Sequence, residues 1–463
     1  MLKNNKKVKF ITLGCKVNQY ETNAMSQKFL EKGYKLIEEK DEEIPDICII
    51  NTCTVTNIAD RKSRQMLRKM KEKNKDVIIV ACGCYAQVAK DDLLKMPEID
   101  LILGNNEKVD IVKYVEEYIE NTKIDEKNNL ENTDTINKKD KTNLEKNTII
   151  KKADVEDVMQ SKEFSDFGEV TFTEKTRAVI KVQDGCDRFC SYCIIPYARG
   201  RVRSRKPENI INEVTKIAQN GIKEVVITGI HIASYGKDFK EDYKLIDLLE
   251  EINKIDGIER IRLGSLEPLL ITDEFVNRLK KLNKICHHFH LSLQSGCDET
   301  LKRMNRRYTV SQFRDIVKIL RNAYNDVNLT TDIIVGFPGE TNEEFNITYQ
   351  FLKEIKFYKM HIFKYSQRKG TKAAKMENQI PGNIKEERST KLIELSNLNE
   401  LEYNKKYIGK NVDVLFEEKK NDIYIGHTQN YIVIHCKSNM NIENKILNVR
   451  CKNAYDDYIL GTM

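Results

Sequence analysis

Three closely spaced cysteines form the most chemically specific feature of the sequence. Cys186, Cys190 and Cys193 make a C-x3-C-x2-C run within DGCDRFCSYCIIP, directly after a strand-like segment that begins at residue 177. Three thiolates can bind three irons of a 4Fe–4S cluster and leave the fourth iron open to a small-molecule chelate. A zinc site or buried thiols are the competing interpretations, but zinc normally has a fourth Cys or His nearby and this loop contains none. We therefore predict an iron–sulfur cluster with one open iron.

A second group of cysteines is spread over the first part of the chain. Cys15, Cys53 and Cys84 lie at or just beyond the ends of three successive strand-like segments. Because open α/β sheets bind ligands at the carboxyl ends of their strands, the three thiols are expected to meet at one edge of a sheet. Buried cysteine is also common in such strands, so core packing remains the alternative that the residues themselves leave open.

The chain is expected to stay in the cytoplasm. Its N-terminus lacks the apolar stretch of a signal peptide, and no window approaches the roughly 20 apolar residues of a membrane span. In that reducing compartment the twelve cysteines are poor candidates for disulfides, which leaves metal binding, redox chemistry or burial. Half of them show no ligand spacing and are expected to be structural: Cys48, Cys82, Cys286, Cys297, Cys436 and Cys451.

The elements that position these cysteines begin with a parallel α/β domain over residues 1–120. Short apolar runs at 9–14, 47–53, 77–84 and 101–105 alternate with stretches rich in helix formers. Such alternation indicates βαβ units, in which helices cover both faces of a parallel sheet.

Residues 121–172 are expected to form a charged, low-complexity linker or insert. Residues 121–160 contain no Gly, Pro, Cys or aromatic residue and consist mainly of Asn, Lys, Asp, Glu and Thr. This composition cannot bury enough apolar surface to order itself.

A second βα series occupies residues 173–404 and contains the C-x3-C-x2-C run. Its six strand-like segments begin near residues 177, 224, 260, 289, 328 and 357, and helical patterns separate them. Six units fit a TIM-like barrel that remains open, since a closed barrel needs eight. Active sites of such barrels lie at the carboxyl ends of the strands, which is where the cysteine run falls.

The last 59 residues, 405–463, have a different sequence pattern. Their β-branched, alternating runs are separated by polar turns and show little helical periodicity, which predicts a small β-barrel. The fold class is therefore α/β: a parallel α/β domain, an open (β/α)6 barrel and a C-terminal β-barrel.

The charge of the chain permits a nucleic-acid partner without requiring one. Its 78 basic and 71 acidic residues give a formal net charge of +7. Two basic clusters can contact RNA phosphates, with a solvated helix face as the alternative. They are Arg199, Arg201, Arg203, Arg205 and Lys206 after the cysteine run, and Arg61, Lys62, Arg64, Arg68 and Lys69 on one helix.

Three histidines flank one strand without making a convincing metal motif. His287, His288 and His290 are close in sequence, but the period of two in a strand sends alternate residues to opposite faces. We therefore do not expect a histidine metal site there.

Seven motifs, in order along nearly the whole chain, resemble those of the radical S-adenosylmethionine methylthiotransferases. They are LGCKVNQYET, NTCTVT, GCYAQ, DGCDRFCSYCIIPYARGRVRSR, TGIHIASYG, QSGCDETLKRMNRRYT and TDIIVGFPGET. The resemblance implies S-adenosyl-L-methionine and two 4Fe–4S clusters as cofactors. It assigns the radical-generating cluster to Cys186, Cys190 and Cys193, and an auxiliary cluster to Cys15, Cys53 and Cys84. The tail resembles the family's TRAM domain, an RNA-contacting β-barrel.

The resemblance also implies a substrate. TGIHIASYG, HLSLQSGCDETLKRMNRRYT and TRAVIKVQDGC are most similar to the branch that acts on N6-threonylcarbamoyladenosine beside the anticodon of tRNA. The expected reaction inserts a methylthio group at C2 of that base. The same chemistry on isopentenyladenosine or on a ribosomal-protein aspartate is an alternative, and a non-enzymatic iron–sulfur RNA-binding protein is an alternative of another class.

Further partners and contacts follow from the resemblance. The expected partners are the tRNA anticodon loop and an electron donor such as flavodoxin or ferredoxin, with no membrane; the oligomeric state is not specified. No catalytic side chain beyond the cluster ligands is expected. The residues expected to contact S-adenosyl-L-methionine can also be strand-end caps. They are Thr228, Gly229, Ser265, Glu267, Gln294 and Asp332.

Overall fold

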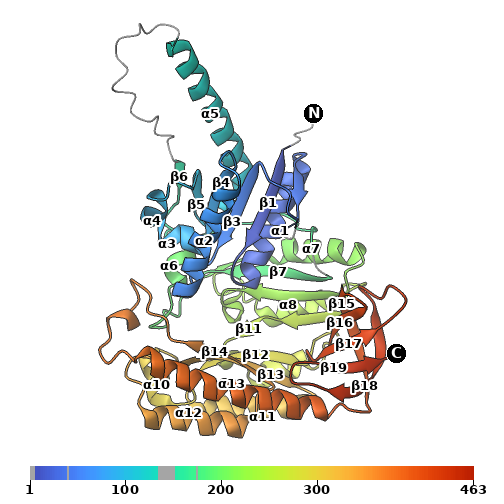
Figure 1. Cartoon of the computed structure of the whole chain (residues 1–463). Helices are drawn as coiled ribbons and strands as arrows, with labels where there is room; N and C mark the ends of the chain where they lie inside the picture. The colour runs from blue at the N-terminus through green and yellow to red at the C-terminus, as the bar shows by residue number, and fades with distance from the viewer. Residues whose placement is uncertain (1–5, 39–40, 134–151, 174–175) are drawn as a thin grey trace. The chain divides into compact units, whose positions relative to one another are not determined.

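The computed structural model describes residues 6–38, 41–133, 152–173 and 176–463 (Figure 1). The chain divides into two compact units. Unit 1 consists of Met1–Ser161, Ser165–Phe172 and Tyr197–Gly200. Unit 2 consists of Lys162–Phe164, Thr173–Pro196 and Arg201–Met463.

Unit 1 is built on one parallel sheet with the strand order β2-β1-β3-β4-β5-β6. The strands are β1 (Lys7–Thr12), β2 (Lys35–Ile37), β3 (Ile47–Thr52), β4 (Ile78–Gly83), β5 (Leu101–Leu103) and β6 (Lys152–Asp154). Its helices are α1 (Lys16–Glu31), α2 (Asn57–Lys73), α3 (Cys84–Val88), α4 (Lys90–Leu94), η1 (Glu107–Asp110) and α5 (Ile111–Thr133). Every residue of β3 is buried, as expected for a central strand of a parallel sheet that is covered on both faces.

The predicted linker at 121–172 contains ordered elements in its described parts. Residues 121–133 continue α5, and β6 adds to the sheet by pairing Leu101 with Lys152 and Leu103 with Asp154. Strand pairing satisfies backbone N–H and C=O groups whatever the side chains are, so a polar composition does not exclude an edge strand. Residues 134–151 lie outside the described residues, and the domain bounds 1–120, 121–172, 173–404 and 405–463 remain predictions.

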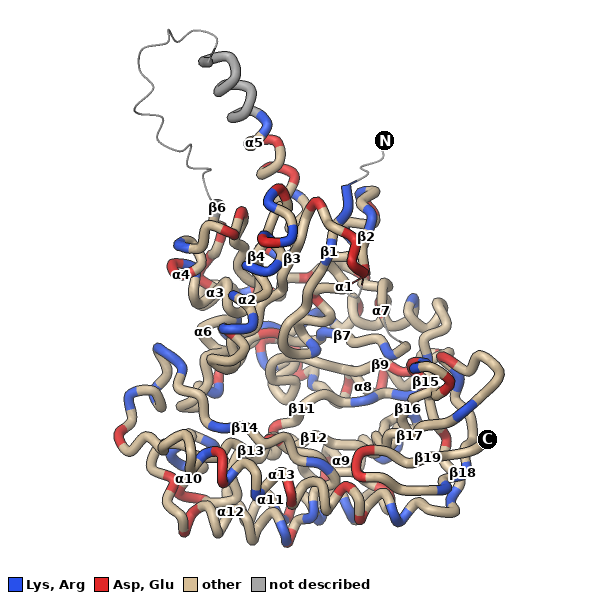
Figure 2. The backbone as a smooth tube through the Cα atoms, in the orientation of Figure 1, with Lys and Arg blue, Asp and Glu red and all other residues tan. Residues whose placement is uncertain are grey.

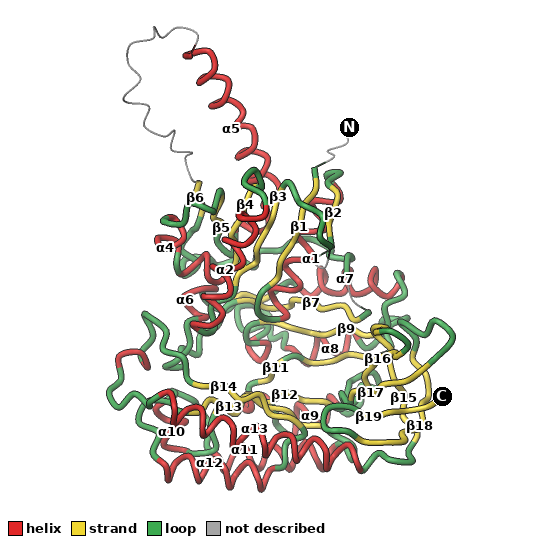
Figure 3. Tube along the Cα trace, in the orientation of Figure 1, coloured by secondary structure: helices red, strands yellow, loops and turns green. Residues whose placement is uncertain are grey.

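Unit 2 contains the open barrel that the sequence predicts. The parallel strands β7, β9, β10, β12, β13 and β14 coincide with the six predicted segments; β8 adds antiparallel to β7, and β11 adds to β12. The two resulting sheets, β10-β9-β7-β8 and β11-β12-β13-β14, are linked by a parallel bridge between Ile261 and Ile285. Figure 3 shows α11, α12 and α13 along one side of β12, β13 and β14.

These strands and the helices between them have the following residue bounds, in chain order. The strands are β7 (Arg177–Asp184), β8 (Arg203–Ser204), β9 (Glu224–Gly229), β10 (Arg260–Leu263), β11 (Ser265–Leu266), β12 (His288–Gln294), β13 (Asn328–Val335) and β14 (Lys359–Lys364). The helices are α7 (Pro207–Gln219), η2 (Ile232–Ser234), α8 (Leu245–Ile252), η3 (Pro268–Leu270), α9 (Asp273–Leu279), α10 (Asp298–Arg303), α11 (Val310–Ala323), α12 (Asn342–Ile355), η4 (Ala373–Lys375) and α13 (Gly382–Lys405). A further helix, α6 (Ile195–Arg199), begins in unit 2 and ends in unit 1.

The C-terminal part of unit 2 is a closed β-barrel, as predicted. Its strand order is β15-β16-β17-β19-β18. The strands are β15 (Asn411–Lys420), β16 (Ile423–Thr428), β17 (Val433–Lys437), β18 (Ile446–Ala454) and β19 (Ile459–Thr462). Buried and half-buried residues alternate along β16, because successive side chains point to opposite faces of a strand. Among the described helices of the chain, none is long and apolar enough to cross a membrane.

A buried charge network joins the open barrel to the C-terminal barrel. The carboxylate of Glu224 faces the guanidiniums of Arg177, Arg260 and Arg262, with Arg262 Nε 2.7 Å from Glu224 Oε1. Arg262 also lies 4.8 Å from the ring centroid of Tyr431. The remaining N–H groups of Arg260 and Arg262 donate to carbonyl oxygens of the C-terminal barrel: those of Asp413, His427, Thr428 and Gln429. One carboxylate thus faces three arginines, two of which, Arg260 and Arg262, fasten the two barrels together.

Glu224→Gln is expected to lower the free energy of unfolding by about 3–5 kcal/mol, because the buried guanidiniums lose their shared counter-charge. Urea unfolding of the full chain measures this. Glu354→Gln provides the control: its partner Arg314 lies at the surface, and exposed pairs contribute about 1 kcal/mol or less.

The pH dependence tests the electrostatic origin of this effect. Burial alone raises the pKa of Glu224, but Arg262, Arg177 and Arg260 lower it below the ordinary value of 4.5. The carboxylate therefore stabilises the fold above about pH 4.5, and its contribution falls as the pH drops below that value. The difference between the wild type and Glu224→Gln should shrink there; a difference that stays constant would contradict the assignment.

Candidate functional site

The C-x3-C-x2-C loop follows β7 at the carboxyl end of the open barrel's first strand. A second segment fixes its shape: Ser191 N–H donates to the carbonyl of Met304 at 3.0 Å, and Asn305 Nδ2 donates to that of Phe189 at 3.0 Å. Phe189 has a φ of 48°, a conformation that non-glycine residues rarely adopt. The Asn305 hydrogen bond helps to hold this turn between Cys186 and Cys190.

Hydrogen-bond donors surround the sulfurs of this loop. The backbone N–H of Arg188 lies 3.4 Å from Cys186 Sγ, and Arg306 Nη1 lies 3.4 Å from Cys190 Sγ. Burial raises the pKa of Cys186 and raises that of Cys193 to about 12, and the nearby Cys190 adds to both shifts. These thiols therefore keep their protons at neutral pH until iron displaces them. Donors and cations that stabilise sulfur as thiolate fit a cluster-binding loop.

Within the described ranges, no three His, Cys, Asp or Glu side chains lie close enough together to hold a single metal ion. A 4Fe–4S cluster does not need such an arrangement, because its thiolates bind different irons and lie correspondingly farther apart.

The six residues predicted to contact S-adenosyl-L-methionine lie on or directly after strands of the open barrel. Thr228 and Gly229 end β9, Gln294 ends β12, and Asp332 lies within β13. Gly229 has no room for a side chain, since a Cβ there would lie 2.9 Å from the carbonyl oxygen of Gln183. The contacts of these residues with the cofactor remain predictions.

Ser265 and Glu267 lie on and just after β11. Ser265 is exposed, whereas Glu267 is buried and its Oε2 lies 3.4 Å from Arg188 Nη2 in an ion pair. Since Arg188 belongs to the C-x3-C-x2-C run, this ion pair brings Glu267 to the cysteine loop.

No spacing or composition in the sequence singles out Arg188, Arg306 or His231. Arg188 Nε lies 3.4 Å from His231 Nε2, and His231 Nδ1 lies 2.8 Å from Ser234 Oγ. Burial lowers the pKa of His231 to about 3, and the positive charge of Arg188 is the next largest cause. This imidazole is therefore neutral at physiological pH. Their positions inside the TGIHIASYG, DGCDRFCSYC and QSGCDETLKRMNRRYT motifs were the only available signal.

The interior face of β12–β14 carries polar side chains. Leu291 and Leu293 pack in the hydrophobic core, and the alternate residue His290 pairs with Asp332 at 3.2 Å. His290 and His288 both lie within hydrogen-bonding distance of Thr330 Oγ1, at 3.0 and 2.9 Å. These histidines therefore contact a hydroxyl and a carboxylate.

Unit 1 brings Cys15, Cys53 and Cys84 to the carboxyl ends of β1, β3 and β4. Cys15 precedes α1, Cys53 follows β3 and Cys84 begins α3. A Cβ on Gly14 would lie 2.8 Å from Cys53 Sγ, so the turn before Cys15 is in contact with the second cysteine. Cys53 and Cys84 are buried and Cys15 is exposed. The expected meeting of the three thiols at one sheet edge is confirmed; their binding of a cluster remains a prediction.

The electrostatics of this trio show that the thiols influence one another. Burial raises the pKa of Cys53 to about 12, and the charges of Cys84 and Cys15 add to this shift. Arg199 acts in the opposite direction on this thiol. Its guanidinium, also in unit 1, donates from Nε to Cys84 Sγ at 3.2 Å.

The interpretation of the arginine run after the cysteine loop as an RNA contact is wrong for three of its members. Arg199, Arg203 and Arg205 are at most 1 % exposed. Arg199 pairs with Glu21 and Arg205 with Glu213. Arg203 lies within 4.0 Å of Asp184. Arg201 and Lys206 are exposed and remain available to a phosphate.

The other basic cluster lies on α2. Figure 2 shows Lys and Arg interspersed with Asp and Glu along the described backbone. Arg61, Lys62, Arg68 and Lys69 are exposed, whereas Arg64 donates to the hydroxyl of Tyr85 at 2.6 Å. Contact of this helix with RNA remains a prediction.

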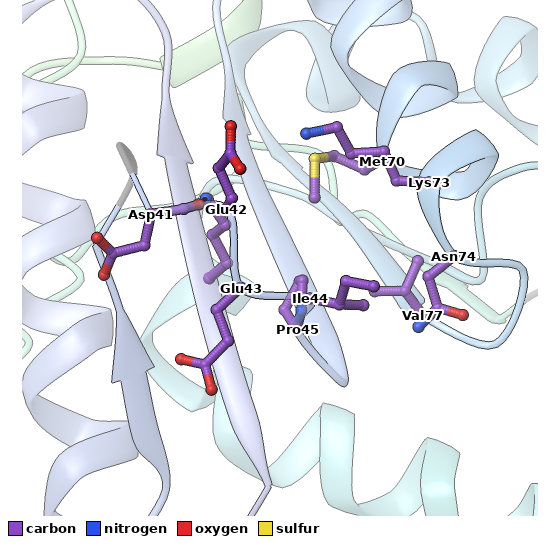
Figure 4. Close-up of a pocket in the computed structure, with 10 residues that line it drawn as sticks. Asp41, Glu42, Glu43, Ile44, Pro45, Met70, Lys73, Asn74 and Val77 are labelled. Atoms are coloured by element: carbon purple, nitrogen blue, oxygen red, sulfur yellow. Dashed lines mark hydrogen bonds between the residues drawn. The ribbon is translucent and has the colours of Figure 1, made fainter.

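The cavities of the two units differ in size. The pocket of Figure 4, lined by Ile44, Pro45 and Val77, has a volume of about 30 Å³, the share of one water molecule, and lies near the amino ends of β3 and β4. It is therefore at the sheet edge opposite the cysteines. In unit 2 a cavity of about 710 Å³ lies between the loops that follow β9 and β11, lined by residues such as Phe239 and Leu269.

Comparisons with known proteins cover the whole chain. The Radical SAM superfamily pattern matches residues 180–352, and that of Uncharacterized protein family UPF0004 matches residues 7–104. The chain is 39% identical to the threonylcarbamoyladenosine tRNA methylthiotransferase MtaB of Bacillus subtilis, covering 98% of this chain and 95% of that protein. It is 36% identical to the tRNA-2-methylthio-N(6)-dimethylallyladenosine synthase of Clostridium beijerinckii, over 100% and 97%.

Among solved structures, the chain resembles the radical S-adenosylmethionine methyltransferase TsrM of Kitasatospora setae. The TM-score is 0.53 at 15% identity, covering 78% of this chain and 73% of that one. At this identity the likeness concerns the fold alone.

In the metal-free protein, Cys53 and Cys193 are expected to react with iodoacetamide about 1,000-fold more slowly at about pH 8 than in urea-unfolded chain, because a pKa near 12 instead of 9.0 leaves far fewer thiolates. Peptide mass spectrometry measures each site, with the unfolded protein as the control. Because the pKa values are raised, the rates should keep rising up to about pH 12. A plateau of the reaction rates near pH 9 would show that the pKa values of these thiols are not raised.

Proposed function

Because the chain belongs to the radical S-adenosylmethionine methylthiotransferase family, we propose that it inserts a methylthio group at C2 of N6-threonylcarbamoyladenosine beside the anticodon of tRNA. The product is 2-methylthio-N6-threonylcarbamoyladenosine. The observation that carries the proposal is the second cysteine trio at the sheet edge of unit 1, since a radical generator with one cluster needs no such group. The substrate rests on relatives at 39% and 40% identity whose names specify it.

The chemistry explains why such an enzyme is needed. An aromatic C–H bond at adenine C2 has neither an acidic proton nor a leaving group, so acid–base side chains cannot replace it with sulfur. S-adenosyl-L-methionine on a 4Fe–4S cluster supplies a 5′-deoxyadenosyl radical that can attack such a bond. Cys186, Cys190 and Cys193 would hold that cluster, and Cys15, Cys53 and Cys84 the auxiliary one. The chain's own contribution is to position these groups and to exclude water.

The residues around the first cysteine loop have defined positioning roles in this proposal. The Arg188–Glu267 ion pair orients a carboxylate toward the cofactor side of the loop. Arg306 stabilises Cys190 as thiolate through its 3.4 Å contact with the sulfur. Thr228, Gly229, Ser265, Gln294 and Asp332 complete the proposed cofactor set.

The proposal assigns substrate binding to basic and β-rich surfaces. The C-terminal barrel has the architecture expected of a TRAM domain and would bind tRNA, with the exposed lysines and arginines of α2 as further phosphate contacts. The target base must leave its stack in the anticodon loop to reach the sulfur. We place this activity in the cytoplasm, with flavodoxin or ferredoxin as electron donor.

A second candidate keeps the chemistry and changes the base. Relatives at 34–36% identity are named for dimethylallyladenosine, so isopentenyladenosine is the alternative substrate. The two substrates differ physically: threonylcarbamoyladenosine carries a carboxylate on its N6 substituent, whereas the isopentenyl group is an uncharged hydrocarbon.

Substrate choice is tested with purified enzyme, reconstituted anaerobically with iron and sulfide and then given S-adenosyl-L-methionine, dithionite and tRNA. Nucleoside mass spectrometry should show methylthiolation of tRNA bearing threonylcarbamoyladenosine at least about tenfold faster than of tRNA bearing isopentenyladenosine, which corresponds to about 1.4 kcal/mol in transition-state binding. The reverse preference would overturn the substrate. Absence of 5′-deoxyadenosine would favour a non-enzymatic RNA-binding protein.

The two-cluster assignment predicts about eight irons per reconstituted chain and about four in the triple variant C15A/C53A/C84A. That variant should still form 5′-deoxyadenosine while losing methylthiolation, because its radical-generating loop is intact. The matched control is C48A/C82A, which removes two fully buried cysteines of the same sheet and should retain eight irons. Eight irons in the triple variant would refute the auxiliary site.

A further inference from the structure

Unit 1 buries three charged side chains beside the second cysteine trio. Arg199 and Lys108 are fully buried and Glu21 is 1 % exposed. Both cations contact the same carboxylate: Lys108 Nζ lies 2.6 Å from Glu21 Oε2, and Arg199 Nη1 lies 2.7 Å from Glu21 Oε1. These three side chains form a buried triad in which both cations share one carboxylate.

The guanidinium of Arg199 is directed at one sulfur of the trio. Its two terminal nitrogens are committed, since Nη2 donates to Asn18 Oδ1 at 2.7 Å and both contact Glu21. The planar guanidinium is thereby fixed in orientation. The remaining donor, Nε, points at Cys84 Sγ at 3.2 Å. A neutral thiol is a weak acceptor, whereas sulfur that carries negative charge is a strong one.

A second donor approaches the same sulfur. Asn105 Nδ2 lies 3.9 Å from Cys84 Sγ. The side chain is held in place because Nδ2 also donates to the carbonyl of Ala198 at 2.7 Å, and the backbone N–H of Asn105 donates to Gln87 Oε1 at 2.8 Å. Cys84 is thus the member of the trio on which both donors converge.

A cluster bound through three thiolates is anionic and becomes more so on reduction. Hydrogen bonds to its cysteine sulfurs and nearby positive charge therefore stabilise the reduced state and raise its reduction potential.

We propose that Arg199 is a positioning residue for the auxiliary cluster: its hydrogen bond to Cys84 and the charge of the Arg199–Glu21–Lys108 triad set the reduction potential of that cluster. This inference rests on the auxiliary cluster of the proposed function. Arg199 follows Cys193 by six residues in the sequence, so one short segment supplies ligands for the first cluster and a tuning group for the second.

The test is a redox titration of the full-length protein in the background C186A/C190A/C193A, where the auxiliary cluster gives the only iron–sulfur signal in electron paramagnetic resonance. At a fixed ambient potential, Arg199→Gln is expected to lower the ratio of reduced to oxidised cluster about tenfold, equivalent to about 59 mV for a one-electron couple. Lys108→Met, which leaves the Cys84 hydrogen bond in place, should shift the ratio in the same direction by less. An unchanged ratio in Arg199→Gln overturns the proposal.

Arg205→Gln is the matched control for a merely structural role. Arg205 is as deeply buried as Arg199 and is paired with Glu213 at 3.0 Å, but it lies in unit 2. Both substitutions should lower the thermal unfolding temperature of the metal-free chain, while only Arg199→Gln shifts the auxiliary cluster. Equal shifts from both would overturn the proposal.

Two further measurements keep the outcome decisive. If Arg199→Gln fails to fold, Asn105→Leu removes the other donor to Cys84 without removing a charge, and an unchanged ratio in that variant counts against the proposal. Iron analysis distinguishes failure of this proposal from failure of the proposed auxiliary cluster. In the background variant, absence of iron shows that the auxiliary cluster itself is wrong, whereas about four irons with an unshifted potential contradicts only the role of Arg199.

Discussion

Parallel strands end at a common edge of their sheet, and both cysteine groups of this chain depend on that constraint. In unit 1 the edge collects Cys15, Cys53 and Cys84 from separate βα turns, although the first and the last are 69 positions apart in the sequence. In unit 2 the corresponding edge of the open barrel carries the C-x3-C-x2-C loop together with Thr228 and Gln294. Backbone hydrogen bonding, not side-chain chemistry, brings these groups together, so each site is as rigid as the sheet that carries it.

The two sites share an electrostatic design. Burial raises the pKa of most of their thiols, which opposes the thiolate form that iron requires. In each unit an arginine donates to one cysteine sulfur: the half-buried Arg306 to Cys190, and the fully buried Arg199 to Cys84. The cations offset the cost of placing anionic sulfur in a poorly solvated environment. They also provide a fixed positive charge close to each group of sulfurs.

The features that indicate the radical chemistry do not by themselves distinguish one modified adenosine from another. The cysteine motifs and the open barrel are compatible with either modified adenosine, and relatives named for both are similar over nearly the full chain. Selection must then depend on groups that meet the N6 substituent, where a carboxylate and a hydrocarbon demand opposite environments. In the open barrel, His290 and Asp332 form one polar pair, with 3.2 Å between Nε2 and Oδ2.

Local spacing in the sequence determined the cysteine loop, the six barrel strands, the C-terminal β-barrel and the cysteines at strand ends, because hydrophobic period and short motifs depend on near neighbours. Only the tertiary structure decided which charged residues are buried and which are exposed. The arginine run predicted to face RNA is largely buried, since Arg199 meets Glu21 from 178 positions away and Arg205 meets Glu213 inside the fold. β6 likewise joins the sheet through pairing with β5 that its polar composition does not reveal. A charged side chain can be buried only if folding places a partner beside it. The position of that partner depends on the fold of the whole chain.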